Sequence, residues 1–136
     1  MKYSTYVSMS FLFFALAGTS HSQVPQIERE ALLALYNSAG GPSWTEFWEI
    51  ADTDECTWYG ITCNNDSVTS IMLSDNGLNG IIPSELGNLI NLTGLYLYSN
   101  SLSGSIPSEL GNLTNLTSLY LYSNSLSGSI PSELGN

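Results

Sequence analysis

Apolar residues recur along this chain with two different periods, and each period predicts a different element. In residues 27–39 they lie three or four positions apart, which is the spacing of one face of an α-helix, and Gly-Gly-Pro follows at 40–42. In residues 95–98 two leucines alternate with two tyrosines, which is the period of a half-buried strand. We therefore expect an amphipathic helix near the N-terminus and short strands with leucines turned inward and tyrosines outward.

The strand pattern belongs to a unit of 24 residues that is repeated. Units 87–110 and 111–134 differ only at Ile90/Thr114 and Gly94/Ser118. A diverged unit precedes them, and the positions that it shares with both copies are Val68, Ile71, Leu73, Asn76, Leu78, Gly80, Ile82 and Pro83. One such coil cannot bury its own leucines, but stacked coils cover one another. The period therefore predicts a solenoid with short parallel strands on one face.

Three further positions of the unit predict how each coil turns. Asn100 can hydrogen-bond backbone groups that a turn leaves unpaired, and Gly104 allows a backbone angle that other residues avoid. Ile-Pro at 106–107 favours an extended segment that cannot continue a helix. Residues 108–111 then form a short return path to the next coil.

These motifs resemble those of the plant-type extracellular leucine-rich repeat, LxxLxLxxNxLxGxIPxxLGxL, over residues 64–136. Residues 23–63 resemble the N-terminal cap of that family, with a helix, Trp44 and Trp48, and the motif CTWYGITC at 56–63. The resemblance implies an α/β solenoid, a right-handed leucine-rich repeat superhelix with short parallel strands on one face and an N-terminal helical cap. The helix of the cap would cover leucine edges of the first coil.

Residues 1–22 have the pattern of a secretory signal peptide. Lys2 supplies a basic start, residues 11–17 form a short apolar core, and small residues precede a cleavage point before Gln23. The apolar run is shorter than the roughly 20 residues that a membrane-spanning helix needs, although a retained N-terminal anchor is the alternative. We expect a secreted, extracellular or cell-surface protein with no other segment able to span a membrane.

The charge of the chain excludes two classes of partner. Twelve acidic residues face two basic ones, which gives a net charge of −10. Nucleic acids and anionic membranes would repel such a surface, so we expect neither as a partner. Removal of residues 1–22 would take away the only histidine, His21, and leave Arg29 as the only basic side chain.

The two cysteines, Cys56 and Cys63, stand close together in the sequence. In an oxidising compartment such a pair is typical of a disulfide that closes a small loop. Two cysteines without a histidine cannot complete a four-ligand zinc site. We therefore predict a disulfide and no metal or other cofactor.

Catalysis is disfavoured by the shortage of bases. Without its signal the chain has no histidine or lysine to activate a serine, and both cysteines are used. Asp52, Asp54 and Glu55 cluster before the first cysteine, but their spacing lacks the glycine and distal glutamate of an EF-hand. We interpret these three acids as solvated loop residues and do not expect an enzyme.

The outward side of the strands is the candidate ligand-binding face: Met72, Tyr96, Tyr98, Tyr120 and Tyr122. Parallel strands lie about 4.8 Å apart, so we expect Tyr96 beside Tyr120 and Tyr98 beside Tyr122, in a flat patch with the hydroxyls outward. Tyrosine offers a large contact area at low entropy cost and is enriched where proteins bind one another. The alternative is that tyrosine merely suits an exposed strand and that duplication copied it.

Four asparagines stand in the N-glycosylation motif, followed two positions later by serine or threonine: Asn65, Asn91, Asn112 and Asn115. Glycans on Asn91 and Asn115 would stand beside the strand face, because both precede a strand at equivalent positions. Alternatively, the motif follows from the repeat's own composition, and in a bacterial host it would carry no glycan.

The last coil reaches residue 136 without a C-terminal cap. A solenoid needs a cap at each end, so Leu119, Leu121 and Leu126 would turn an open apolar side to the solvent. Two explanations are open: a truncated or fragmentary product, or an end-to-end dimer through the last coil.

Together these observations predict a secreted or surface recognition module, without catalytic activity, that binds a protein, peptide or glycan on its strand face. The resemblance implies roles such as those of polygalacturonase-inhibiting proteins or receptor-like kinase ectodomains, of which the chain would be an N-terminal fragment. A structural or ice-binding surface protein is a further alternative. Thr69, Thr93 and Thr117 recur every 24 residues, as an ice-binding face requires, but bulky tyrosines stand beside them.

Overall fold

The computed structural model describes residues 23–51 and 54–135. The predicted signal peptide and its alternative, the anchor, lie outside these residues. The helix and strands are α1 Gln26–Ser38, β1 Ile61–Asn64, β2 Ser67–Met72, β3 Asn79–Ile81, β4 Gly94–Tyr96, β5 Ser101–Gly104, β6 Ser118–Tyr120 and β7 Ser125–Leu126. The short 3₁₀ helices are η1 Gly41–Ser43, η2 Glu55–Thr57, η3 Ser84–Asn88, η4 Ser108–Asn112 and η5 Ser132–Gly135.

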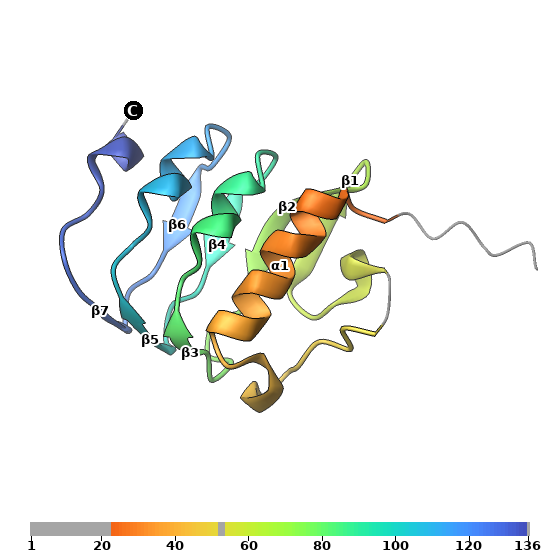
Figure 1. Ribbon diagram of the computed structural model, residues 1–136, viewed down its shortest axis with the longest axis horizontal. Helices are drawn as coiled ribbons and strands as arrows, with labels where there is room; N and C mark the ends of the chain where they lie inside the picture. Colours follow the sequence, from red (N-terminus) through yellow and green to blue (C-terminus); the bar gives the residue numbers. More distant parts are fainter. Residues whose placement is uncertain (1–22, 52–53, 136) are drawn as a thin grey trace, which may run out of the picture.

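Helix α1 agrees with the predicted helix to within one residue at each end. Its apolar face is fully buried at Ala31, Leu32 and Leu35, as the helical spacing requires. The chain leaves the helix through Gly40, whose φ of +75° is a left-handed conformation that glycine adopts without strain. The helix packs against η3 and β3 of the first coil (Figure 1).

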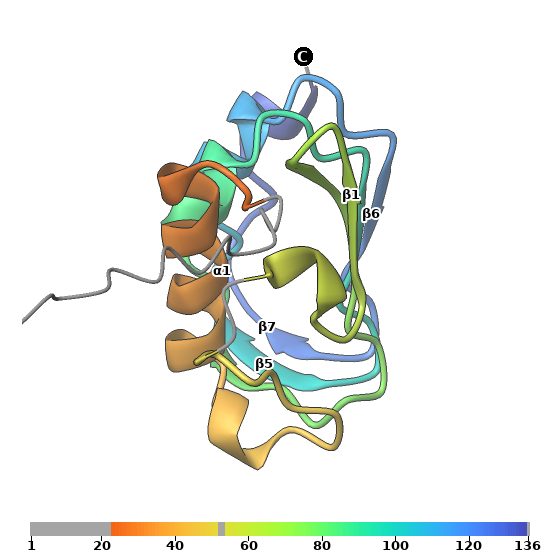
Figure 2. The same cartoon turned by 90° about the vertical axis from the view of Figure 1, so that its right-hand side faces the viewer.

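Each coil contributes one strand to each of two separate sheets, which run along the stack of coils. The first has the order β1-β2-β4-β6, and Ile71, Leu95 and Leu119 are paired across its parallel strands. The second has the order β3-β5-β7 and is also parallel. Figure 2 shows β1 and β6 on the side of the molecule opposite α1. The solenoid of short parallel strands predicted from the repeat is therefore confirmed.

Strand β1 was not predicted from the sequence. It pairs antiparallel with β2, with Ile61 opposite Ile71, and so extends the first sheet by one strand beyond the repeats. Cys63 lies in β1 and is bonded to Cys56 in η2, which confirms the predicted disulfide. The bond ties the loop before the repeats to the edge strand of the sheet.

The repeated asparagines join one coil to the next. Side-chain Nδ2 of Asn100 donates to the carbonyl oxygens of Leu97 in its own coil, at 3.0 Å, and of Leu73 in the coil before, at 2.8 Å. Its Oδ1 accepts from the backbone N–H groups of Asn76 and Leu78, at 3.1 and 3.0 Å. The predicted role of this asparagine at the turn is therefore confirmed.

Two buried carboxylates, those of Glu28 and Glu55, bind partners within or next to the N-terminal segment, in addition to its apolar contacts. Glu55 is only 1% exposed and forms an ion pair with Arg29, whose guanidinium also lies 5.5 Å from the ring centroid of Trp58. Glu28 is 3% exposed, and its Oε2 accepts the backbone N–H of Val68 at 2.7 Å. The interpretation of Glu55 as a solvated acid was wrong, because α1 brings Arg29 over that loop.

The apolar interior is continuous from α1 to the last coil. Leu73 and Leu97 are fully buried in successive coils, whereas Leu121 at the equivalent position is only partly buried. The same holds for Leu119 and Leu126, which pack against the core from one side. Among the described residues, no helix combines the length and the apolar character that crossing a membrane requires.

Candidate functional site

The first sheet places the candidate residues in rows that cross its strands. Pairing of β2 with β4 puts Met72 next to Tyr96, and pairing of β4 with β6 puts Tyr96 next to Tyr120. The side chains of Met72 and Tyr120 are 54% and 47% exposed. The predicted neighbourhood of Tyr96 and Tyr120 is confirmed, and their ring centroids lie 5.2 Å apart.

A second row follows directly after the strands. The backbone N–H of Leu97 donates to the carbonyl oxygen of Tyr120 at 2.9 Å, and that of Ser99 donates to Tyr122 at 3.1 Å, so the parallel ladder continues past β4. It holds Tyr98 and Tyr122 side by side, with centroids 4.8 Å apart and planes within 10°. Stacked rings of this kind contribute about 1 kcal/mol beyond the area they bury, so this row is preorganised.

The expected flat patch is wrong in one respect, because the two rows differ. Tyr96 and Tyr120 meet at an interplanar angle of 90° rather than face to face. The ring of Tyr96 lies over Gly94, where an added Cβ would come 2.6 Å from its Cε2. Ser118 occupies the equivalent position before Tyr120 and has that Cβ. Tyr96 is half-buried, whereas Tyr120 is exposed on the edge strand β6. Tyr98 and Tyr122 differ in exposure in the same direction, although the residues around them are identical.

Tyr59 is an exposed aromatic residue at the β1 edge of the first sheet, and it was not singled out from the sequence. It is 49% exposed and directly precedes Gly60, whose carbonyl oxygen accepts the backbone N–H of Met72 at 2.8 Å. The antiparallel pairing of β1 thus brings Tyr59 to the edge of the sheet near Met72. Because Tyr59 lies outside the 24-residue repeat, no periodic signal could have placed it there.

The repeated threonines form a ladder of their own along the sheet. The Oγ1 of Thr93 donates to the carbonyl oxygen of Thr69 at 2.9 Å, and that of Thr117 donates to Thr93 at 3.0 Å. Their hydroxyl protons are therefore directed to the neighbouring coil. This arrangement gives the threonines a structural role in coil stacking.

Three of the four candidate glycosylation sites gather at one edge of the face. Asn65, Asn91 and Asn115 line a polar hollow of about 470 Å³ beside Thr69 and Thr93. Asn65 lies in the β1–β2 turn, and the Nδ2 of Asn115 donates to the carbonyl oxygen of Ile90 at 2.9 Å. The fourth, Asn112, ends η4 and does not line this hollow. All four side chains are exposed, and their glycosylation stays a prediction.

A stack of leucine-bearing coils with an asparagine at each turn, preceded by a helix and a disulfide-linked strand, defines the leucine-rich repeat class of extracellular protein. The chain belongs to the leucine-rich repeat family, of the plant-type extracellular kind. The family model described as leucine rich repeat matches residues 66–126, and that of the leucine rich repeat N-terminal domain matches residues 25–64.

Named relatives are plant proteins that are much longer than the matched region. The chain is 39% identical over 90 residues to a probable inactive receptor kinase of Arabidopsis thaliana, which covers 65% of this chain and 13% of the relative. It is 32% identical over 92 residues to the polygalacturonase inhibitor of Pyrus communis, covering 65% and 28%. These relatives agree with the extracellular or surface location that the sequence predicts.

Solved structures share the fold along most of the chain. The BIR2 ectodomain from Arabidopsis thaliana is 36% identical with a TM-score of 0.70, covering 82% of this chain and 62% of that one. The Arabidopsis receptor kinase HAESA, solved with the peptide hormone IDA and the co-receptor SERK1, is 28% identical with a TM-score of 0.54. The match covers 82% of this chain and 24% of that one. A plant ice-binding protein is 28% identical with a TM-score of 0.55, and the match covers 82% of this chain and 45% of that one.

Proposed function

We propose that this chain is a recognition module without catalytic activity, which binds a protein, peptide or glycan on the exposed face of its first sheet. The observation that carries the proposal is the pair of exposed rings on β6, the last strand of the first sheet, and the turn after it, Tyr120 at 47% and Tyr122 at 60% exposure. Each is held by a tyrosine of the preceding coil. Rigid aromatic side chains of this kind lose little conformational entropy on binding.

The likeness to a receptor kinase ectodomain solved with a peptide hormone supports a peptide as one candidate ligand. The match to part of a receptor kinase supports the proposal that the chain corresponds to the N-terminal part of such an ectodomain. The division into residues 1–22, 23–63 and 64–136, the capping role of α1 and the right-handed superhelix belong to the same proposal. The end-to-end dimer gains no support from the comparisons and stays a prediction.

Ice binding is the second candidate, favoured by the likeness to a plant ice-binding protein. Against it, the hydroxyls of Thr93 and Thr117 donate to neighbouring carbonyl oxygens. The same sheet also carries Tyr96 and Tyr120, whose rings meet at 90° and do not form a flat surface. An ice-binding face would slow the recrystallisation of ice in the presence of the purified chain. Absence of that effect at high protein concentration would remove this candidate.

The test of the first candidate is a binding screen of the purified chain on arrays of plant cell-wall glycans and synthetic peptides. The double variant Tyr120→Ser/Tyr122→Ser removes the exposed rings, and Ile81→Ser removes an apolar side chain of similar exposure from β3 in the second sheet. Loss of buried aromatic contacts of this kind weakens binding by about tenfold or more. We expect that loss in the double variant alone; equal binding by all three proteins would overturn the proposal.

A further inference from the structure

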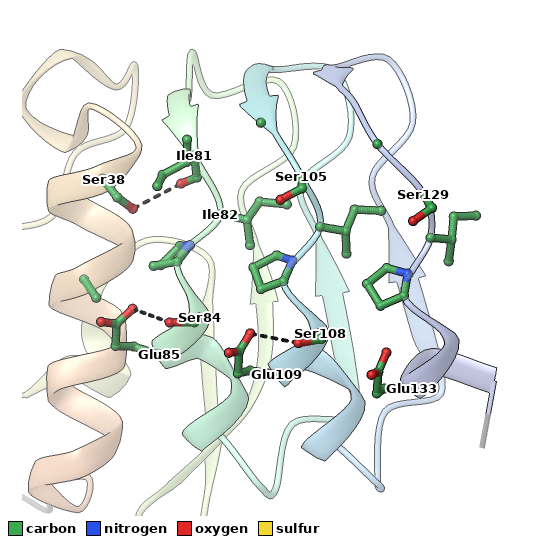
Figure 3. Close-up of a pocket in the computed structure, with 18 of the residues that line it drawn as sticks. Ser38, Ile81, Ile82, Ser84, Glu85, Ser105, Ser108, Glu109, Ser129 and Glu133 are labelled. Carbon is green, nitrogen blue, oxygen red and sulfur yellow. Dashed lines mark hydrogen bonds between the residues drawn. The ribbon is translucent and has the colours of Figure 1, made fainter.

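A long groove crosses the coils on the side of α1 and the second sheet, away from the tyrosines. It has a volume of about 1340 Å³ and begins at Ala34, Asn37 and Ser38 of α1. The rest of its lining comes from the same segment of each coil, residues 81–85, 104–109 and 128–133. Figure 3 shows these segments side by side. The groove is therefore periodic along the axis of the solenoid.

The floor of the groove is apolar. Isoleucine and proline of each coil form it, and their burial decreases from Ile82 at 3% exposure, through Ile106, to Ile130 at 75%. At the end nearest α1, Ile81 is 52% exposed. An extended ligand could therefore cover exposed apolar surface along the whole groove.

One wall of the groove carries a row of carboxylates. Glu85, Glu109 and Glu133 are exposed, and each accepts a hydrogen bond on Oε2 from the serine before it, at 3.4 to 3.5 Å. Figure 3 shows the three glutamates in a row, with the bonds to Glu85 and Glu109 drawn. Close packing of the coils sets their positions, because a Cβ on Gly87 or Gly111 would meet the Cβ of the next glutamate at 2.9 or 2.5 Å. Among the described residues, none that lines the groove is basic.

The spacing of the carboxylates selects among extended ligands. Where parallel strands join them, successive coils lie about 4.8 Å apart, so positions two coils apart along the second sheet are separated by about 9.6 Å. In a polyproline II segment, residues three apart are separated by about 9.3 Å. In a β-strand, residues on one face are separated by about 6.7 Å, which matches neither one nor two coil spacings. A polyproline II segment therefore matches the two-coil spacing and a strand does not.

We propose that this groove is a second interaction surface, which binds an extended basic segment of a partner polypeptide in the polyproline II conformation. Lysine or arginine at every third residue would face the carboxylates of Glu85 and Glu133, and the residues between would pack on the isoleucine and proline floor. Charge complementarity with a chain of net charge −10 supports a basic partner. This site is separate from the proposed tyrosine face.

The probe is a fluorescently labelled peptide, Pro-Pro-Lys-Pro-Pro-Lys-Pro, titrated with the whole chain. The groove variant is Glu85→Gln/Glu109→Gln/Glu133→Gln. A matched control, Glu49→Gln/Asp66→Asn/Asp75→Asn, removes three exposed acids elsewhere and has the same net charge. We expect the peptide to bind about tenfold more weakly to the groove variant and unchanged to the control. The peptide Pro-Pro-Lys-Pro-Lys-Pro-Pro, with equal charge and length and a shorter spacing, should bind more weakly to the unaltered chain.

Three results would overturn this inference. The peptide could fail to bind the unaltered chain, or the two variants could lose equal affinity, which would mean binding to net charge rather than to the groove. Spermine could displace the peptide as well as an unlabelled copy does, which would mean that the groove recognises an aliphatic polycation instead of a polypeptide. Unfolding temperatures of both variants, measured alongside, would show that each is folded in the assay.

Discussion

The phenol ring of Tyr96 lies over Gly94, at a position where the next repeat has Ser118. Tyr120, in that next coil, stands at 90° to Tyr96, whereas Tyr98 and Tyr122 stack within 10°. One of only two sequence differences between the repeats thus lies beside the ring pair that does not stack. The greater exposure of Tyr120 and Tyr122 has another cause, since both belong to the coil at the edge of the sheet.

Replacement of Gly94→Ser should raise the ring of Tyr96, because the new Cβ would come 2.6 Å from Cε2 in the present position. We expect the ring of Tyr96 to turn away from residue 94 and to stack on Tyr120 as Tyr98 stacks on Tyr122. A crystal structure of the variant would show this directly. If the rings stayed perpendicular, Gly94 would not be the cause of the difference.

Asn100→Ala should destabilise the chain by about 3 kcal/mol, because it leaves several buried backbone groups of two coils unpaired. Asn124→Ala is the matched comparison. Its Oδ1 accepts from the N–H of Leu102, but the side chain lies nearer the less buried end of the core. Urea unfolding of both variants should show the larger loss at Asn100; equal losses would contradict a role that depends on burial.

Removal of the disulfide by Cys56→Ser/Cys63→Ser should lower the free energy of unfolding by about 2.5 kcal/mol, as estimated for closure of a loop this short. The measurement is thermal unfolding of the unaltered chain with and without a reducing agent, beside the double variant. An unchanged unfolding temperature in both experiments would mean that the bond does not stabilise the join between η2 and β1.

The ion pair of Arg29 and Glu55 should behave as a buried pair. Arg29→Met leaves the carboxylate of Glu55, which is only 1% exposed, without its cation, and should lower the free energy of unfolding by about 3 kcal/mol. Adding Glu55→Gln to that variant removes the uncompensated charge and should recover part of the lost free energy of unfolding. A double variant less stable than Arg29→Met would show that Glu55 contributes through contacts other than this pair.

Local chemistry in the repeat could be predicted without the structure, because it depends on residues close in sequence or one period apart. The inward side chains of Leu95 and Leu97 follow from the alternation of leucine and tyrosine, and the hydrogen bonds of Asn100 follow from turn chemistry. The positive φ of Gly104, +76°, was predicted in the same way. Stacking of identical coils then placed Tyr98 beside Tyr122.

Contacts between unlike segments were decided only by the tertiary structure. Strand β1 and the burial of Glu55 depend on how the N-terminal segment folds back on the first coil, for which the repeat offers no template. The tilt of Tyr96 depends on free space above Gly94. The end of the groove at Ala34, Asn37 and Ser38 likewise depends on where α1 packs, whereas the row of glutamates follows the 24-residue period. The 24-residue period determines the backbone path and the buried side chains that each coil shares with the next. Packing between segments that do not repeat determines how the N-terminal segment covers the first coil, because no periodic pattern specifies those contacts.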